Sequence, residues 1–329
     1  MGKLYCLRRS VITQEVIVVT RKEKRVLLPS QKRRRELLFI GLALLWPITQ
    51  FIVFWVVPNF NSIVMAFRVP DGETFTLVNF QRFFRELQQP NNPIIPSFWN
   101  SIILFVVGTF IQFPLVILLT YVLFKKVYGH KVFRVIFYTP AILGASVTTA
   151  LYRYLISSNG PVERILDLIG VEYSKQLGLL GNPETVFLMI IIYGFWTGVG
   201  TNMIMMLGAM NRVPDEIFDS ARIDGVGFWR ELFQIILPMI WPTLTTLIVF
   251  SMTGIFTNSA ATMLLAPDAP EASTIGWYIT RFTMSAGSGL TGEILNYPAA
   301  VGLIFTAISF PLIMLTKWLC DKITNTVEY

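Results

Sequence analysis

Long apolar runs separated by short polar segments dominate the pattern of this 329-residue chain. Each of six runs offers the roughly 20 mostly apolar residues that a helix needs to cross a bilayer. These runs are residues 37–57, 99–124, 133–156, 186–210, 239–262 and 297–318. None of the 20 acidic residues falls inside them, and Arg153 lies near a run end, where it can reach the interface. The pattern predicts an all-α integral membrane protein with six transmembrane helices.

Composition and charge agree with this class and add an orientation. Hydrophobic residues make up 53% of the chain and charged residues 14%, which is unlike an ordinary soluble domain. Most of the 27 Lys and Arg residues fall in residues 1–36, 125–134, 211–231 and the C-terminus. Because basic loops stay in the cytoplasm, we expect both termini and the 211–238 loop on that side of the membrane.

The basic N-terminal segment, residues 1–36, is predicted to be a cytoplasmic segment preceding one membrane domain, residues 37–329. It lacks the apolar core and cleavage site of a signal peptide. Its basic clusters, residues 21–25 and 32–35, directly precede a span, which favours contact with anionic lipid head groups over nucleic acid.

Motifs for catalysis and metal binding are missing from the sequence. There is no GxxxxGK[ST] phosphate loop, GxSxG elbow or HExxH pair, and His130 has no Cys or carboxylate partner at ligand spacing. Cys6 and Cys320 indicate no disulfide framework. We therefore expect no catalytic residue, no metal site and no bound cofactor in this chain, which predicts that it is not itself an enzyme.

The charged segment 214–238 carries the most specific local signals. Pro214 suits a first helical position, Asp215 and Glu216 suit a helix N-terminus, and Gly225 suits a helix end. A second amphipathic stretch follows, and Pro238 and Pro242 are expected to bend the start of the next span. Two short helices with a sharp corner are predicted, as in a docking surface; an ordinary solvated loop is the alternative.

The spacing of this segment resembles the signature of importer-type ABC transporter permeases, Glu-Ala-Ala, three residues, Gly, nine residues, Ile, one residue, Leu-Pro. Asp219, Ser220 and Ala221 occupy the first three places, and Gly225, Ile235, Leu237 and Pro238 fall in register. Asp for Glu and Ser for Ala depart from the family pattern.

Further short matches follow in order along residues 37–320. The first two are Val78-Asn79-Phe80 with Phe83 and Phe84, and Phe98-Trp99-Asn100-Ser101. The third consists of Lys131, Phe133 and Arg134, followed by Pro140, and the fourth of Trp196 and Gly198. Together they resemble the carbohydrate-uptake branch of ABC importers, in particular the first permease of maltose and multiple-sugar systems. The resemblance implies the type I ABC importer permease fold.

The same resemblance implies a division of labour in a bacterial plasma membrane. A cytoplasmic ABC ATPase dimer would bind ATP and Mg²⁺, a second permease would complete a heterodimer, and an extracytoplasmic protein would deliver an oligosaccharide. The coupling residues implied for contact with the ATPase are Glu216, Asp219, Ser220, Ala221, Asp224, Gly225 and Pro238.

Uncharged polar residues cluster in the fourth and fifth spans. Small and hydroxyl residues, including Gly194 and Gly198 in a GxxxG pattern, are also typical of helix packing, and that interpretation stays open. Hydroxyl and amide groups both donate and accept hydrogen bonds, as sugar hydroxyls do. By resemblance to the maltose-type permease, the substrate path would be lined by Thr197, Gly198, Thr201, Ser251, Gly254 and Asn258.

Two alternatives compete with a sugar importer permease. An ABC importer of phosphate, polyamine or peptide would favour charged groups near the path, which the predicted spans lack. The other alternative is a membrane scaffold without transport. In that case the match of Asp219 through Pro238 to the spacing of the permease signature would be a coincidence.

Overall fold

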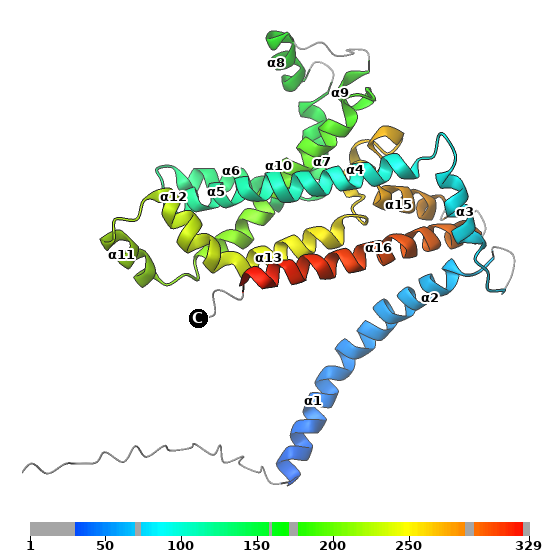
Figure 1. Cartoon of the computed structure of the whole chain (residues 1–329), viewed down its shortest axis with the longest axis horizontal. Helices are drawn as coiled ribbons and strands as arrows, with labels where there is room; N and C mark the ends of the chain where they lie inside the picture. Colours follow the sequence, from blue (N-terminus) through cyan, green and yellow to red (C-terminus); the bar gives the residue numbers. More distant parts are fainter. Residues whose placement is uncertain (1–29, 70–73, 158–159, 171–176, 287–292, 325–329) are drawn as a thin grey trace, which may run out of the picture. The chain divides into compact units, whose positions relative to one another are not determined.

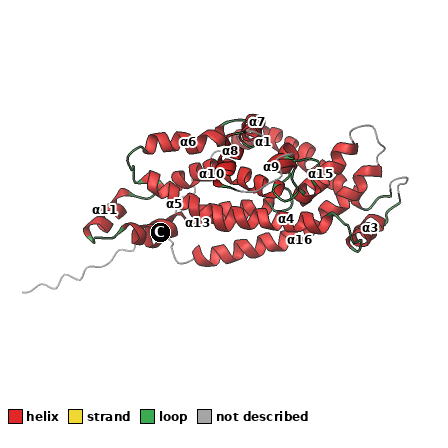
Figure 2. Ribbon diagram, turned by 90° about the horizontal axis from the view of Figure 1, so that it is seen from above, coloured by secondary structure: helices red, strands yellow, loops and turns green. Residues whose placement is uncertain are grey.

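A computed structural model of the chain describes residues 30–69, 74–157, 160–170, 177–286 and 293–324. The described residues form helices joined by turns and loops, with one isolated bridge between Arg68 and Phe75 and no named strand among them (Figure 2). The predicted all-α class is confirmed. The chain divides into two compact units, Met1–Pro58 and Asn59–Tyr329.

Most of the α-helices are labelled in Figure 1. The first half of the chain contains α1 (Ser30–Phe51), η1 (Ile52–Val56), α2 (Val57–Ala66), α3 (Val78–Leu87), α4 (Ile94–Val106), η2 (Val107–Gln112), α5 (Phe113–Phe124), α6 (His130–Ile142), α7 (Ala145–Leu155) and α8 (Pro161–Ile169). The second half contains α9 (Gly178–Gly181), α10 (Val186–Met210), α11 (Asp215–Ile223), α12 (Phe228–Glu231), η3 (Leu232–Ile236), α13 (Leu237–Gly254), α14 (Ala260–Leu265), η4 (Pro270–Ala272), α15 (Ile275–Ala286) and α16 (Glu293–Thr324).

Among the described residues, five continuous helical stretches are long and apolar enough to cross a membrane, and a bent pair of helices makes a sixth. The five are Arg34–Ala66, Ile94–Phe124, Val186–Met210, Phe228–Gly254 and Leu295–Ile323. Each overlaps a span predicted from hydropathy, so the run pattern located these spans correctly.

The third predicted span, residues 133–156, is not one straight helix. It is the bent pair, α6 and α7, which meet at an angle of 109°. Leu143 and Gly144 between them have extended backbone conformations, and Pro140 in the last turn of α6 lacks the N–H that helix continuation would use. The bend therefore lies at the two extended residues Leu143 and Gly144, three and four residues after Pro140.

The fifth predicted span also differs in its limits and in its start. The helix runs from Phe228 rather than residue 239 and ends at Gly254 rather than residue 262. A π-helical turn, η3, lies directly before Pro238, where Pro238 and Pro242 predict a bend. A wider turn is one way for a helix to absorb a proline's missing donor and its ring.

Helix α10 packs against α5, α6 and α13, and α13 lies beside α16 (Figure 1). The largest buried cluster joins residues of α5, α10, η3 and α13 with Phe218 of α11. A second cluster joins α3, α4, α15 and α16. Helices α11 and α3 lie at opposite ends of this second unit (Figures 1 and 2).

Candidate functional site

The segment between α10 and α13 folds into the two short helices with a corner that the sequence predicts. Pro214 is the residue before α11 rather than its first residue, with an extended ψ of 139°. At the other end, the Gly225 N–H bonds the Arg222 carbonyl (3.1 Å) and the Val226 N–H bonds the Ala221 carbonyl (3.0 Å). These are the paired bonds of a Schellman cap, and Gly225 adopts the left-handed φ of 67° that the cap requires.

Most of the predicted coupling residues in this segment are exposed. Glu216, Asp219, Ser220 and Asp224 lie on the outer surface of α11 or at its end. Asp219 is partly engaged, because Arg222 donates to its carboxylate at 3.0 Å. Ala221 is different: it is buried with Phe218 against the rest of the chain, so it supports the helix from inside. Pro238 lies in the first turn of α13.

A cavity of about 230 Å³ lies between three of the membrane helices. It is lined from α4 and η2, from α10, from α13 with the turn that follows it, and from Thr274 before α15. Its polar lining residues are Ser101, Thr109, Gln112, Ser251, Asn258 and Thr274. All of its lining residues are uncharged, so the cavity offers hydroxyl and amide groups without a fixed charge.

Three of the six predicted substrate-path residues line this cavity, namely Ser251, Gly254 and Asn258. The three predicted from α10 do not: the lining from that helix is Ile191, Gly194 and Phe195, all of which precede Thr197. The Thr197 hydroxyl donates to the Tyr193 carbonyl at 2.9 Å, as hydroxyls in apolar helices commonly do. Thr201 is exposed outside the cavity. On α10, this cavity therefore lies nearer the start of the helix than the three residues predicted for the path.

Gln112 is one of four polar cavity residues that sequence reasoning missed, the others being Ser101, Thr109 and Thr274. The Gln112 side-chain amide is buried and donates to the Phe195 carbonyl of α10 at 2.8 Å. Gly198 packs directly against this amide, which explains why no larger residue fits there. An amide in the middle of the apolar run 99–124 is itself a signal, because such groups are costly in a membrane unless they are used.

A second cavity of about 600 Å³ lies on another face of α13, between α2, α15 and α16. Six of the hydroxyls around it donate to carbonyls three or four residues earlier in the chain, namely those of Thr253, Thr257, Thr280, Thr283, Thr306 and Ser309. A hydroxyl whose proton is used in this way still accepts hydrogen bonds. None of the predicted substrate-path residues lines this cavity.

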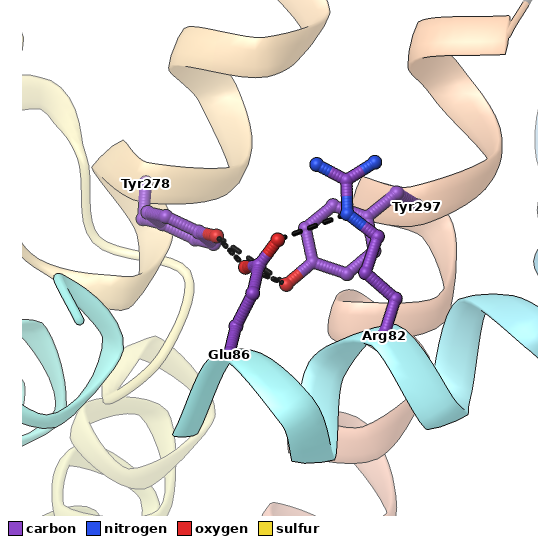
Figure 3. Close-up of polar contacts among 4 residues, drawn as sticks. All are labelled: Arg82, Glu86, Tyr278 and Tyr297. Carbon is purple, nitrogen blue, oxygen red and sulfur yellow. Dashed lines mark hydrogen bonds and ion pairs between the residues drawn. The ribbon is translucent and has the colours of Figure 1, made fainter. Parts of the chain in front are cut away.

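At the end of the unit opposite α11, a carboxylate fastens α3 to α15 and α16 (Figure 3). Glu86 accepts hydrogen bonds from the Tyr278 hydroxyl at 3.1 Å, from Arg82 Nε at 2.9 Å, and from the Tyr297 hydroxyl. The Arg82 guanidinium also lies over the Tyr297 ring, 4.2 Å from its centroid. Burial raises the pKa of Tyr278 to about 12, so its hydroxyl remains a donor at neutral pH.

Several known proteins resemble this chain in sequence. The probable ABC transporter permease protein YurN of Bacillus subtilis is 25% identical over 55% of this chain and 60% of its own length. The maltose/maltodextrin transport system permease protein MalF of Escherichia coli is 24% identical over 67% of this chain and 40% of its own. The matched region thus spans less than two thirds of these two relatives.

Other matches cover nearly the whole chain. The arabinooligosaccharides transport system permease protein AraP of Halalkalibacterium halodurans is 26% identical over 90% of this chain and 92% of its own length. Among solved structures, a bacterial ABC transporter involved in the import of the acidic polysaccharide alginate has a chain with a TM-score of 0.74. That chain is 24% identical, with 89% of this chain and 98% of the other covered, and it shows the same fold.

The family comparison covers the membrane helices and the α11 segment together. A family model described as "binding-protein-dependent transport system inner membrane component" matches residues 36–327. This range includes the cavity, the Schellman-capped helix α11 and all the continuous membrane stretches after residue 36. The chain belongs to the family of inner membrane components of binding-protein-dependent transport systems.

Proposed function

We propose that this chain is one permease subunit of an ATP-driven importer of a neutral oligosaccharide. The observation that carries the proposal is the uncharged cavity between α4–η2, α10 and α13, whose polar lining consists of hydroxyl and amide groups. Such groups pair with sugar hydroxyls in either direction, and they offer no counter-charge for an ionic cargo. The likeness to an arabinooligosaccharide permease over 90% of the chain supports the same cargo class.

The partners follow from the proposed role. Helix α11 presents Glu216, Asp219 and Asp224 on the outside, where they would meet basic groups of a cytoplasmic ATPase. ATP and Mg²⁺ would be bound by that ATPase, and this chain would act without an ATPase site of its own. A second permease would complete the path, and an extracytoplasmic binding protein would deliver the sugar; one solved relative is a complex with a sugar-bound periplasmic protein.

This proposal places α11 and both chain termini in the cytoplasm, as the distribution of Lys and Arg favours. Helix α3 would then lie on the extracytoplasmic side, because it is at the opposite end of the unit from α11 (Figure 1).

The test is uptake by the assembly of this chain with its partner subunits in proteoliposomes. We expect neutral oligosaccharides to enter when ATP is enclosed with the ATPase, and uronic acid oligomers of equal length to enter much more slowly. Asn258→Ala is expected to reduce uptake while the ATPase still co-purifies. Uptake of an acidic or non-sugar cargo alone would contradict the proposed cargo, and a chain purified repeatedly without any ATPase would favour a scaffold.

A further inference from the structure

One partly buried ion pair joins two cavity-lining helical stretches at their ends nearest α11. Lys125 directly follows α5, the end of the stretch Ile94–Phe124, and Glu231 lies in the first turns of the stretch Phe228–Gly254. The Lys125 ammonium pairs with the Glu231 carboxylate. The Glu231 side chain is 7% exposed and that of Lys125 27%, so the carboxylate depends on this cation rather than on water.

The same ammonium group also contacts α11. It lies 5.6 Å from the ring centroid of Phe218, the buried residue that anchors α11, and 5.6 Å from that of Tyr121 in α5. Each of these two rings also packs against another ring. The centroids of Phe218 and Phe124 are 5.4 Å apart, and those of Tyr121 and Phe228 are 4.7 Å apart. Helices α5, α11 and α12 therefore meet at Lys125.

Both stretches that the pair joins reach the cavity farther along their length. The first contributes Gly108, Thr109 and Gln112, and the second contributes Ser251 and Gly254. Each is continuous helix between the pair and the cavity. A movement of α11 that reaches the cavity through these two stretches moves them jointly, as long as the ion pair holds their ends together. Helix α10, which precedes α11 in the chain, is a second connection to the cavity.

We infer that Lys125 and Glu231 are positioning residues for transport, whose ion pair makes the two cavity-lining stretches move as one body with α11. The inference rests on the proposed docking of an ATPase at α11. Without the pair, α11 would still hold the ATPase through its exposed carboxylates. A movement of α11 would then shift the two helix ends relative to each other instead of moving both helices together.

The first test measures solute transported per ATP hydrolysed by the reconstituted assembly. For Glu231→Gln and Lys125→Met we expect this ratio to fall at least about fivefold, as for a lost coupling of ~1 kcal/mol, with the ATPase still co-purifying. The exchanged pair Lys125→Glu with Glu231→Lys is expected to recover most of the ratio. Lys126→Met removes the neighbouring exposed charge and is the matched control.

A second readout needs no cargo. In Ser251→Cys assemblies, we expect ATP to change the rate at which a thiol reagent labels the cavity, and Glu231→Gln to remove most of this change. A purely structural role would lower protein yield and leave the ratio and the ATP response unchanged in the recovered assembly. That result, or labelling that ATP never alters, would overturn the inference, whereas an intact ATP response without sugar uptake would contradict only the proposed cargo.

Discussion

A β-carbon on Gly198 would lie 2.5 Å from Nε2 of Gln112, closer than any real contact of this kind. Gln112 is buried and bonded to the Phe195 carbonyl, so it can yield only by breaking that bond and moving into the cavity. We expect Gly198→Ala to lower the initial rate of uptake by about tenfold, equivalent to ~1.4 kcal/mol. Gly208→Ala, on the same helix with no atom within 4 Å, is the control. Uptake at the unmodified rate by Gly198→Ala would show that the Gln112 side of the cavity is not used.

The contact of Gly200 is with a neighbouring helix instead of the cavity. A β-carbon there would lie 2.5 Å from the Phe137 carbonyl oxygen and 2.9 Å from Cβ of Ala141, both on α6. A backbone atom cannot move away by a rotamer change as a side-chain atom can. We therefore expect Gly200→Ala to cost about 1–3 kcal/mol of stability through overpacking. The measurement is the thermal unfolding midpoint of the purified assembly. Gly194→Ala should leave the midpoint unchanged, since a β-carbon there meets nothing within 4 Å.

The role of Gly225 in the cap of α11 can be tested with a second glycine, Gly227, as the control. Gly225 has a φ of 67° and open space around it, so an added methyl group would cost conformational energy alone. For Gly225→Ala we expect a loss of about 1 kcal/mol in the stability of this corner. Recovery of the ATPase with the tagged chain should fall accordingly. Gly227→Ala, two residues on with a φ of −75°, should not change recovery; equal losses in both variants would argue against the cap.

Removal of one hydroxyl tests the carboxylate that fastens α3. Tyr278→Phe deletes the 3.1 Å bond to Glu86, a hydrogen bond to a charged group that is worth about 1–3 kcal/mol. We expect a lower unfolding midpoint and faster proteolysis around α3. Tyr128→Phe removes the hydroxyl of a fully exposed tyrosine and should change neither. An unchanged midpoint in Tyr278→Phe would mean that Tyr297 and Arg82 hold Glu86 without help.

Hydropathy located the membrane helices well because the cost of placing charge in a bilayer applies along every span. It did not reveal the break at Leu143 and Gly144, since a window of apolar residues looks the same when bent. The α11 corner was predictable for a local reason: Gly225 and the acidic first turn act through their own backbone neighbourhood. Pro238 and Pro242 predict a bend at the start of this span, but they do not reveal the π-helical turn at Leu232–Ile236, because sequence does not distinguish a kink from a π turn.

The cavity shows where a one-dimensional pattern stops being informative. Ser251, Gly254 and Asn258 share one face of α13 and its following turn, so helical spacing was enough to group them. On α10, several small and polar residues follow one another closely in the sequence. Which of them line the cavity and which contact another helix depends on the packing of the helices. Gly198 meets Gln112 and Gly200 meets α6, so the two glycines have different partners. Gly198 and Gly200 both face neighbouring helical segments, as the helix-packing interpretation expects, whereas Gly194 lines the cavity.

The π-helical turns η2 and η3 have a consequence for comparing this chain with its relatives. A π turn in an α-helix accommodates one extra residue, and each residue of an α-helix turns the side-chain direction by about 100°. A relative that lacks one residue at Leu232–Ile236 would therefore form an ordinary α turn there and still present the same side of α13 to the cavity. A one-residue gap at this place in an alignment would mark the loss of the π turn and leave the cavity-facing residues of α13 in register.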